Sequence, residues 1–444
     1  MKPLLRLFAL GCVLLSGNAW ADQRILLTHV TLIDGTGSDP YPGTSLLIED
    51  GKIAKILPYG SEQPKADKII NLQGRYVMPG LVDSHYHLIP GVRTVEEDAR
   101  YRRFALLGGV TAVRDMGGDG AALKDLAARA ESASDPSPRI FFSAFFAGPT
   151  WFANDERVKI LMHGRPKGEA PWARQIKPDT NIAAAVAEAK SAGATGVKIY
   201  ADLTPPQIAG IAKEAKRQGL KVWSHATVFP AKPSDAVNAG VETLSHGNLA
   251  VWEAVDQLPA ISDQATNSMV GWEAQSIDDP RIVKLLEAMK SRGTMLDDTL
   301  IHTKTKLKPA IAKTNAARAD AIERWVIAFV RRANEMGIVI AAGTDFPESP
   351  DDHPYPNIHD EMAILVSNAG LKPLEAIRAA TLNGAKVLGQ EASFGTVAEG
   401  KRADIMVIKG DPRRDMANTR NIEWVMKGGI IYMPDERASA PKPN

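Results

Sequence analysis

The sequence predicts an α/β fold in the form of a parallel (β/α)8 barrel. Two observations predict it. Strand-like apolar runs alternate with helical stretches through the middle of the chain, which is the pattern of βα units. Several of these runs end in a residue able to bind a metal ion. A parallel barrel brings the carboxyl ends of its strands to one rim, where catalytic groups gather, so such residues would meet there.

Eight strand-like runs alternate with helices in this region. Helices are expected at residues 181–192, 205–218, 310–335 and 373–388; Thr204 would cap the second, with proline in its first turn. The strand runs lie at residues 76–88, 109–114, 139–143, 196–200, 220–225, 241–246, 294–300 and 337–345.

Both ends of the chain carry shorter strands separated by turn residues. From residue 25 to residue 71 the pattern is strand-like, and Asp50-Gly51 is a tight-turn signal between two of these strands. A similar pattern returns at residues 403–408 and 424–432. His29 lies in the first of these strands and is expected to be structural.

Charge and composition exclude some classes of partner. The 444 residues include 53 lysines and arginines against 52 aspartates and glutamates, so the chain carries no electrostatic footprint for nucleic acid and no polybasic patch for a membrane. A hydrophobic content of 44% supports a substantial core. A small-molecule substrate is therefore the expected partner, and a homo-oligomer stays open.

The first 21 residues resemble a signal peptide. Lys2 and Arg6 precede a short apolar stretch, and small residues offer a cleavage site after Ala21, so a periplasmic or secreted enzyme without a membrane anchor is expected. A lipoprotein at Cys12 is the weaker alternative, because the surrounding residues form a poor lipobox. Cleavage would leave no cysteine, so nitrogen and oxygen must hold any metal. Residues 436–444 are expected to form a flexible tail.

His85 and His87 are the first candidate ligands. Alternate side chains of a strand share a face, so both imidazoles would point the same way at the strand's end. Such histidine pairs are common on protein surfaces. Whether this one belongs to a metal site therefore depends on whether later segments supply further ligands. Four later runs supply them, ending near Lys198, His225, His246 and Asp345.

The order of these residues resembles the amidohydrolase superfamily of metal-dependent hydrolases. Within it the chain looks most like the imidazolonepropionase-like and Xaa-Pro-dipeptidase-like enzymes. The resemblance implies a small β-sandwich formed by residues 22–75 and 395–435, beside a barrel at residues 76–394. The motifs that carry it are Pro79-Gly-Leu-Val-Asp-Ser-His-Tyr-His87, Gly193-Ala-Thr-Gly-Val-Lys198, Ser224-His-Ala226, Ser245-His-Gly247 and Gly343-Thr-Asp345.

The resemblance also implies two divalent cations. His85, His87 and Asp345 would hold the first, and His225 and His246 the second. A carboxylated Lys198 would bridge them. These ligand types suit zinc, with manganese, iron or cobalt also feasible. The alternative for Lys198 is a surface lysine, which its place between Val197 and Ile199 disfavours.

The implied nucleophile is a hydroxide bridging the two metals, since metal binding lowers the pKa of water to about 7 at zinc. Asp345 would take its proton and deliver it to the leaving amine. The alternative for Asp345 is a helix cap. Deaminases and imidazolonepropionases of the superfamily typically use a single metal, lack the bridging lysine and place a glutamate three residues after the fifth-strand histidine, where this chain has Val228. That difference favours hydrolysis with two metals.

Three side chains are candidates for substrate contact: Tyr200, two residues after Lys198; Arg165, as a partner for a carboxylate; and His359, in the loop after the eighth strand. Long connections at residues 144–179, 249–279 and 347–359 are interpreted as pocket walls and lids. Other polar residues are weaker candidates for the site. His163 and His353 are expected to be solvated, His302 has no special support, and Arg114 and Asp115 are expected to form a structural pair.

The sequence thus predicts an exported amidohydrolase that cleaves an amide-type C–N bond, in a dipeptide or an N-acyl amino acid. The alternatives are a lactonase, an esterase or a cyclic-amide hydrolase, which use the same attack on a carbonyl. A barrel that binds a ligand without turnover is a third class, and intact ligands together with Asp345 argue against it.

Overall fold

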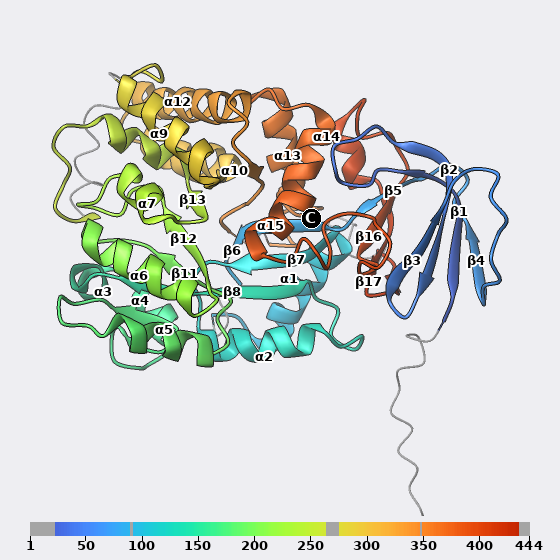
Figure 1. Cartoon of the computed structure of the whole chain (residues 1–444), viewed down its shortest axis with the longest axis horizontal. Helices are drawn as coiled ribbons and strands as arrows, with labels where there is room; N and C mark the ends of the chain where they lie inside the picture. The colour runs from blue at the N-terminus through green and yellow to red at the C-terminus, as the bar shows by residue number, and fades with distance from the viewer. Residues whose placement is uncertain (1–22, 89–91, 263–274, 347–348, 435–444) are drawn as a thin grey trace, which may run out of the picture.

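The computed structural model of the chain describes residues 23–88, 92–262, 275–346 and 349–434 (Figure 1). The expected signal peptide, with Cys12, and the expected tail at residues 436–444 lie outside the described residues, as do parts of two of the long connections. Within the described residues, every helix is too short or too polar to cross a membrane.

Eight parallel strands form the predicted barrel, and each of the eight runs expected from the sequence overlaps one of them. Between the last strand and the first, the N–H of Ser84 donates to the carbonyl of Ala342 at 2.9 Å, which brings the ends of the sheet together. In order around the barrel the strands are β6 (Leu81–Tyr86), β7 (Val110–Asp115), β8 (Arg139–Ala147), β11 (Gly196–Ile199), β12 (Lys221–His225), β13 (Thr243–Ser245), β14 (Met295–Asp297) and β15 (Ile340–Ala341).

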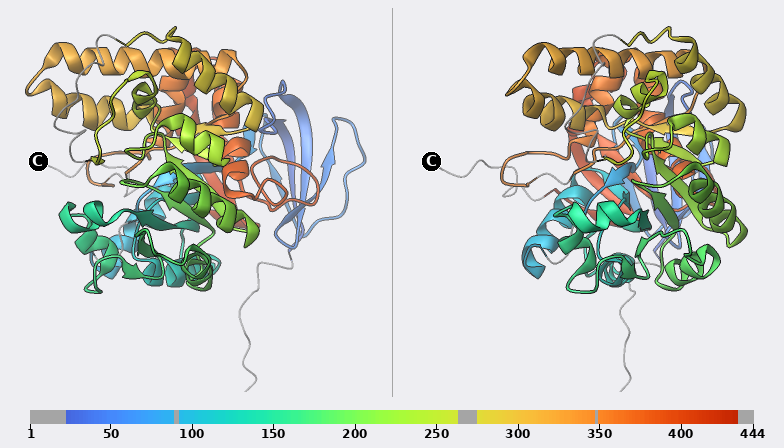
Figure 2. Two further views of the ribbon diagram at one scale, coloured as in Figure 1. Left: turned by 60° about the vertical axis from the view of Figure 1, so that its left-hand side comes forward. Right: turned by 90° about the vertical axis from the view of Figure 1, so that its left-hand side faces the viewer.

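Helices surround the barrel (Figures 1 and 2). Helix α6 shows why they pack there: Ile208, Ile211, Ala212 and Ala215 recur at helical spacing and are buried, with proline in the first turn as predicted. The outer helices include α1 (Val95–Leu107), α2 (Gly120–Ala130), α5 (Ile182–Ser191), α6 (Pro205–Arg217), α7 (Pro233–Ala239), α9 (Pro280–Arg292), α12 (Ala316–Glu335), α13 (Ile358–Ser367), α14 (Pro373–Arg378) and α15 (Gly384–Leu388).

The single helix predicted at residues 310–335 is wrong. Helix α11 (Lys308–Ala312) ends first, and α12 begins at Ala316. The side chain of Asn315 accepts the N–H of Arg318 at 3.0 Å and caps α12. Asparagine competes with helical hydrogen bonding in this way, which is why it starts helices more often than it continues them.

The strands from both chain ends form one hydrogen-bonded sheet, shown in blue and red on the right of Figure 1. It encloses a separate apolar core, which includes Ile25 and Leu46 from the first end and Trp424 from the second. The strands are β1 (Ile25–Leu32), β2 (Tyr41–Glu49), β3 (Lys52–Leu57), β4 (Lys68–Asn71), β5 (Tyr76–Pro79), β16 (Ile405–Ile408), β17 (Ile422–Lys427) and β18 (Ile430–Tyr432).

Strand β5 links this sheet to the barrel. It pairs with β1 on one side and with β16 on the other. The sequence assigned β5 to the barrel, but the first barrel strand is β6, so the barrel begins at Leu81 rather than at residue 76. Only Gly80 separates the two strands, and a Cβ there would lie 2.3 Å from Thr111, so the crossing requires glycine.

The long connection after β8 folds into its own small unit. It contains α3 (Pro149–Asn154), α4 (Val158–Met162), β9 (Glu169–Ala170) and β10 (Ala173–Gln175). Strand β10 pairs with the end of β8, and buried aromatic side chains such as Trp151 and Trp172 join Phe145 of β8 in one cluster. The connection is therefore packed onto the rim of the barrel.

Candidate metal centre and active site

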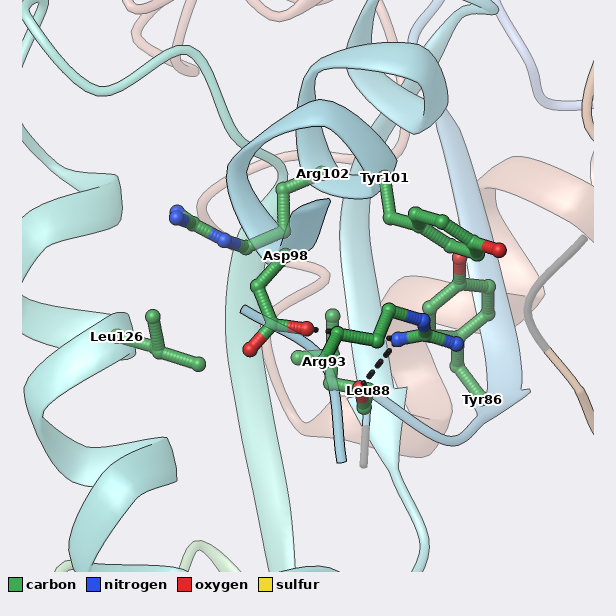
Figure 3. A pocket seen from close by; sticks show the side chains of 7 residues that line it. All are labelled: Tyr86, Leu88, Arg93, Asp98, Tyr101, Arg102 and Leu126. Carbon is green, nitrogen blue, oxygen red and sulfur yellow. Dashed lines mark hydrogen bonds and ion pairs between the residues drawn. The ribbon is translucent and has the colours of Figure 1, made fainter. Parts of the chain in front are cut away.

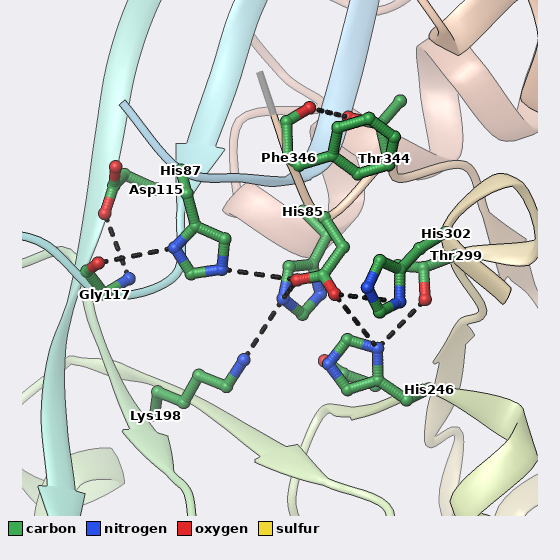
Figure 4. A network of polar contacts seen from close by, with 12 residues as sticks. His85, His87, Asp115, Gly117, Lys198, His246, Thr299, His302, Thr344 and Phe346 are labelled. Atoms are coloured by element: carbon green, nitrogen blue, oxygen red, sulfur yellow. Dashed lines mark hydrogen bonds and ion pairs between the residues drawn. The ribbon is translucent and has the colours of Figure 1, made fainter. Parts of the chain in front are cut away.

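The carboxyl ends of the barrel strands bring the predicted ligands together (Figure 4). Asp345 lies at the centre of this group. Its Oδ1 is 3.1 Å from Nε2 of His85 and 3.3 Å from Nε2 of His87. The Nζ of Lys198, from β11, is 3.1 Å from the same Nε2 of His85. Residues from three distant segments thus meet within contact distance.

The two remaining histidines lie beside them. The ring centroid of His246 is 4.6 Å from that of His85 and 4.8 Å from that of His225. Ligand atoms of His85, His246 and Asp345 all lie within 4.8 Å of one another, so these three could touch one cation. The convergence predicted from the strand ends therefore occurs.

The protonation of these groups suits a divalent cation. Burial alone would raise the pKa of Asp345, but the neighbouring His246 and His85 outweigh it and hold that pKa well below its usual range. Burial also lowers the pKa of His225 and of His246, so both imidazoles are neutral. Ionised carboxylate and neutral imidazole are the forms in which these side chains bind metals. The donor set fits the cation that the sequence predicts.

Lys198 is the unusual member of the group. Its side chain is 1% exposed, and burial lowers its pKa to about 7, against the opposing charges of Asp345 and Asp297. An ammonium ion at this position would repel a divalent cation and could not bind it. Near pH 7 a substantial fraction of Lys198 is therefore the neutral amine.

Three residues at the rim have a left-handed backbone. The φ angles of His246, Thr299 and Asp345 are 65°, 58° and 68°. This region is uncommon for residues other than glycine, and for a β-branched threonine it is an outlier that only the surrounding structure can maintain. His246 directly follows β13, Thr299 lies two residues beyond β14 and Asp345 four beyond β15, so these turns stand at the carboxyl ends of the barrel strands.

The predicted pair of Arg114 and Asp115 is wrong. Arg114 points into the barrel, where it bonds to Asp297 and to the carbonyl of Ser84. Asp115 turns the other way and accepts the N–H of Leu88 at 2.7 Å. Successive side chains of a strand leave its opposite faces, so neighbours in sequence seldom pair directly.

The seventh strand supplies groups that were not predicted to take part. Oδ2 of Asp297 lies 2.7 Å from Nδ1 of His85, and Thr299 Oγ1 lies 2.9 Å from Nδ1 of His246. Nδ1 of His302 lies 3.3 Å from Oδ2 of Asp345. The strand-end rule that identified the other residues applies equally to the run at 294–300, which ends in polar residues and could have pointed to this region.

Arg93 anchors Leu88, the residue that follows His87 (Figure 3). Arg93 donates to the carbonyl of Leu88 at 3.1 Å and pairs with Asp98 at 3.5 Å, while its guanidinium lies 3.8 Å from the ring centroid of Tyr101. The cavity lined by these residues has no space for a water molecule. Arg93 thus holds Leu88, and the space between these residues offers no room for a ligand.

The three predicted substrate contacts differ in their positions. Tyr200 lies at the site, with its ring centroid 4.0 Å from that of His225. Arg165 is exposed, and its guanidinium lies 5.0 Å from the ring of Trp172, within the unit that follows β8. Arg157, which was not predicted, lies closer, 5.7 Å from the centroid of Tyr200, and is held by Asp155.

The prediction for His359 is wrong. The residue lies in helix α13 rather than in a loop, and it is fully buried. Its Nδ1 is 2.9 Å from Thr419 Oγ1, and its Nε2 is 2.8 Å from the carbonyl of Gly108. Burial lowers its pKa to about 4. Both nitrogens are thus engaged by the protein, and His359 ties α13 to the neighbouring elements.

The family model of the amidohydrolase family matches residues 76–431. This chain belongs to the amidohydrolase family. It is therefore a hydrolase of carbon–nitrogen bonds, as predicted, and the cluster around Asp345 is a candidate metal site at the position where the predicted ligands meet.

Curated relatives and solved structures extend the comparison. The chain is 25% identical over 395 residues to imidazolonepropionase of Deinococcus radiodurans, covering 84% of this chain and 88% of that protein. It is 24% identical over 463 residues to ochratoxinase of Aspergillus niger, covering 93% and 87%. The structure of a Xaa-Pro dipeptidase with bound methionine has a TM-score of 0.72 and 22% identity, covering 93% of this chain and 100% of that chain. That structure shares the fold of this amidohydrolase.

Proposed function

We propose that this amidohydrolase is a metal-dependent enzyme that cleaves the amide bond of a dipeptide or an N-acyl amino acid. The observation that carries the proposal is the state of Lys198. Its amine is buried at 3.1 Å from Nε2 of His85 and has a pKa of about 7. A neutral amine among metal ligands can react with carbon dioxide to form a carbamate, which converts a poor ligand into an anionic one.

The carboxylated Lys198 would bridge two divalent cations, with zinc the expected metal. His85, His87 and Asp345 would hold one, and His225 and His246 the other. When bound, such cations lower the pKa of water to about 7 and polarise the scissile carbonyl. The ionised Asp345 and the neutral imidazoles support this assignment.

Asp345 has a second function in the proposal. Its Oδ1 faces His85 and His87, whereas its Oδ2 lies 3.3 Å from His302 and 3.9 Å from His246. Oδ2 would take the proton of the attacking water and transfer it to the leaving nitrogen. Without that proton the nitrogen would leave as an amide anion, which is a very poor leaving group.

Hydrolysis of a cyclic amide is the second candidate. It is favoured by the likeness to imidazolonepropionase. Against it stands Val228, three residues after His225, where enzymes of that type carry a glutamate; the side chain here is apolar and 1% exposed. A lactonase or an esterase remains the further alternative, because esters react by the same attack.

Metal analysis and a substrate panel test the proposal. We expect two metal ions per chain, and turnover of N-acyl amino acids or dipeptides exceeding that of matched esters, lactones and cyclic amides. One metal ion per chain with preference for a cyclic amide would favour the second candidate. No turnover of any compound by the metal-loaded protein would support a binding function.

The proposal extends to export and cleavage after Ala21. Determination of the N-terminus of the protein recovered from cell fractions would test it. A periplasmic or secreted protein that begins at Asp22 is expected, and a cytoplasmic protein that retains Met1 would contradict it.

A further inference from the structure

Lys306 places a positive charge at an open side of the ligand cluster. The short helix α10 (Leu300–His302) ends at His302, and the π-helical turn Thr303–Leu307, which carries Lys306, follows directly. Such turns are rare and occur often at functional sites. The side chain of His302 is 32% exposed, whereas that of His85 is 0% exposed, so the cluster is open to solvent beside His302.

Two aromatic rings connect Lys306 to the cluster. Phe346 directly follows Asp345 in the chain, and its ring centroid lies 6.0 Å from that of His302 (Figure 4). The Nζ of Lys306 lies 4.7 Å from the centroid of the same phenylalanine ring. His302 in turn has its Nδ1 3.3 Å from Oδ2 of Asp345. Through these two rings the ammonium is connected to the group around Asp345.

The ammonium of Lys306 is available to a ligand. The side chain is exposed, and within the described residues it forms no ion pair and no hydrogen bond. A ring face attracts the cation but leaves its three N–H donors for oxygen acceptors. Lys308, two residues later, shows the contrast, because its Nζ is held by Asp320 at 2.8 Å and by Glu323 at 2.6 Å. The charge of Lys306 has no such compensation among the described residues.

Two arginines near this rim are less suited to bind an anion. Arg157 lies beside Tyr200, but its Nε and Nη2 donate to the two carboxylate oxygens of Asp155 at 2.9 Å and 2.5 Å, which compensates its charge. Arg165, predicted from the sequence as the partner of a carboxylate, lies over Trp172 and, within the described residues, contacts none of the predicted metal ligands. Lys306 combines an uncompensated charge with a position beside the cluster.

We propose that Lys306 binds the free carboxylate of the substrate, and that the enzyme therefore prefers amides that carry this group to matched amides without it. This inference rests on the proposed function and adds to it a residue that determines specificity. Dipeptides and N-acyl amino acids both carry a carboxylate one carbon away from the scissile nitrogen. An ammonium donates charge-assisted hydrogen bonds to such a group, and the flexible stem of lysine lets Nζ reach it.

The test compares N-acetylalanine with N-acetylalaninol, in which a hydroxymethyl group replaces the carboxylate and the scissile amide is unchanged. Lys306→Met removes the charge and keeps an unbranched side chain, whereas Lys306→Arg keeps a positive charge. Lys304→Met is the matched control, because Lys304 is an exposed lysine of the same π-helical turn that, within the described residues, has no contact with Phe346.

We expect the wild type and the control to prefer N-acetylalanine. Lys306→Met should lower kcat/KM for that compound about tenfold, chiefly through a higher KM, as for a lost hydrogen bond between charged groups. Its kcat/KM for N-acetylalaninol should equal that of the wild type, and Lys306→Arg should retain most of the preference. Added salt should weaken the preference of the wild type more than any preference that Lys306→Met keeps, because ions screen an exposed pair.

A wild type without preference, equal losses on both compounds in Lys306→Met, or a preference that this variant keeps in full would overturn the inference. So would a preference lost instead in Arg157→Met or Arg165→Met. If the wild type cleaves no amide, the proposed function fails, and calorimetric binding of the same pair decides the inference separately. Tighter binding of N-acetylalanine by the wild type, weakened about tenfold in Lys306→Met, would support it. Equal binding of the two compounds, or no binding of either, would contradict it.

Discussion

Asp297 and His85 form a fully buried contact, with Oδ2 of the aspartate 2.7 Å from Nδ1 of the histidine. Ser245 at 3.0 Å and Arg114 bind the same oxygen. Because the carboxylate engages Nδ1, the lone pair of His85 available to a metal is on Nε2, which faces Asp345 and Lys198. Such outer carboxylates orient the ring and raise its basicity.

Asp297→Asn should therefore weaken metal binding by about 10- to 100-fold. Competition with a chelator measures this affinity. Since the substitution leaves Arg114 without its charged partner, the double variant Arg114→Met/Asp297→Asn separates metal loss from unfolding. Asp298→Asn is the matched control, because Asp298 is equally buried and burial already raises its pKa well above the usual range. If Asp297→Asn and the wild type bound the metal with equal affinity, Asp297 would not be the residue that orients His85 for metal binding.

Lys198→Ala should lose most of the bound metal and reduce kcat/KM by at least about 100-fold, since it removes the proposed bridge. Added acetate should restore part of both, because a free carboxylate can occupy the vacated space. Metal content is measured alongside rates. The control is Lys190→Ala, which removes an exposed lysine that donates to the carbonyl of Gln218. A variant that keeps its full metal content and activity would contradict carboxylation at this position.

His85→Ala should abolish turnover and leave the fold largely intact, as judged by circular dichroism, since the barrel does not depend on that side chain for its strand pairing. The metal content should fall with the activity.

Asp345→Asn should also abolish turnover, because an amide cannot take up the proton that the leaving nitrogen needs. Steady-state rates with the metal-loaded variant measure this. Full activity of Asp345→Asn would exclude Asp345 as the group that carries the proton.

Glu361 should make stability fall with rising pH. Burial raises its pKa from 4.5 to about 8, against the N–H donors of Ile301 and Leu300. Between these two values the native state binds more protons than the unfolded state, so its contribution to stability is present below about pH 4.5 and is lost as the pH rises through 8.

Thermal unfolding of the wild type and of Glu361→Gln from pH 5 to pH 9 measures this contribution. The gap in Tm, wild type minus variant, should narrow or reverse towards pH 9, since the variant cannot ionise. Glu287→Gln, on the exposed face of α9, is the control. A gap that stays constant across the range would show that Glu361 is ionised throughout.

The barrel and the convergence of the ligands could be predicted from the sequence because both follow from local patterns. An apolar run that ends in His85 or His246 reveals a strand end, and parallel strands bring their ends to one rim. The same reasoning missed His302 because it lies beyond its strand, on a short helix whose direction depends on the left-handed Thr299. The hydrophobic periodicity of a sequence does not predict a turn of this kind.

Other differences have equally local causes. His359 was assigned to a loop because Pro354 and Pro356 closely precede it, whereas helix α13 begins at Ile358. Arg114 was paired with its neighbour because its true partner, Asp297, lies 183 residues away. Contacts between distant charged residues inside a barrel depend on the register of every intervening strand.

Strand β5 has a consequence for the order of folding. It is paired on one edge by β1 and on the other by β16, and through Gly80 it leads into the strand that carries His85. The last of its partners is synthesised only when nearly the whole chain has been made. We therefore expect the metal ions to bind only after synthesis of the chain is complete. A shortened chain that lacks β16 should fail to form the metal site, although it would still contain every proposed ligand.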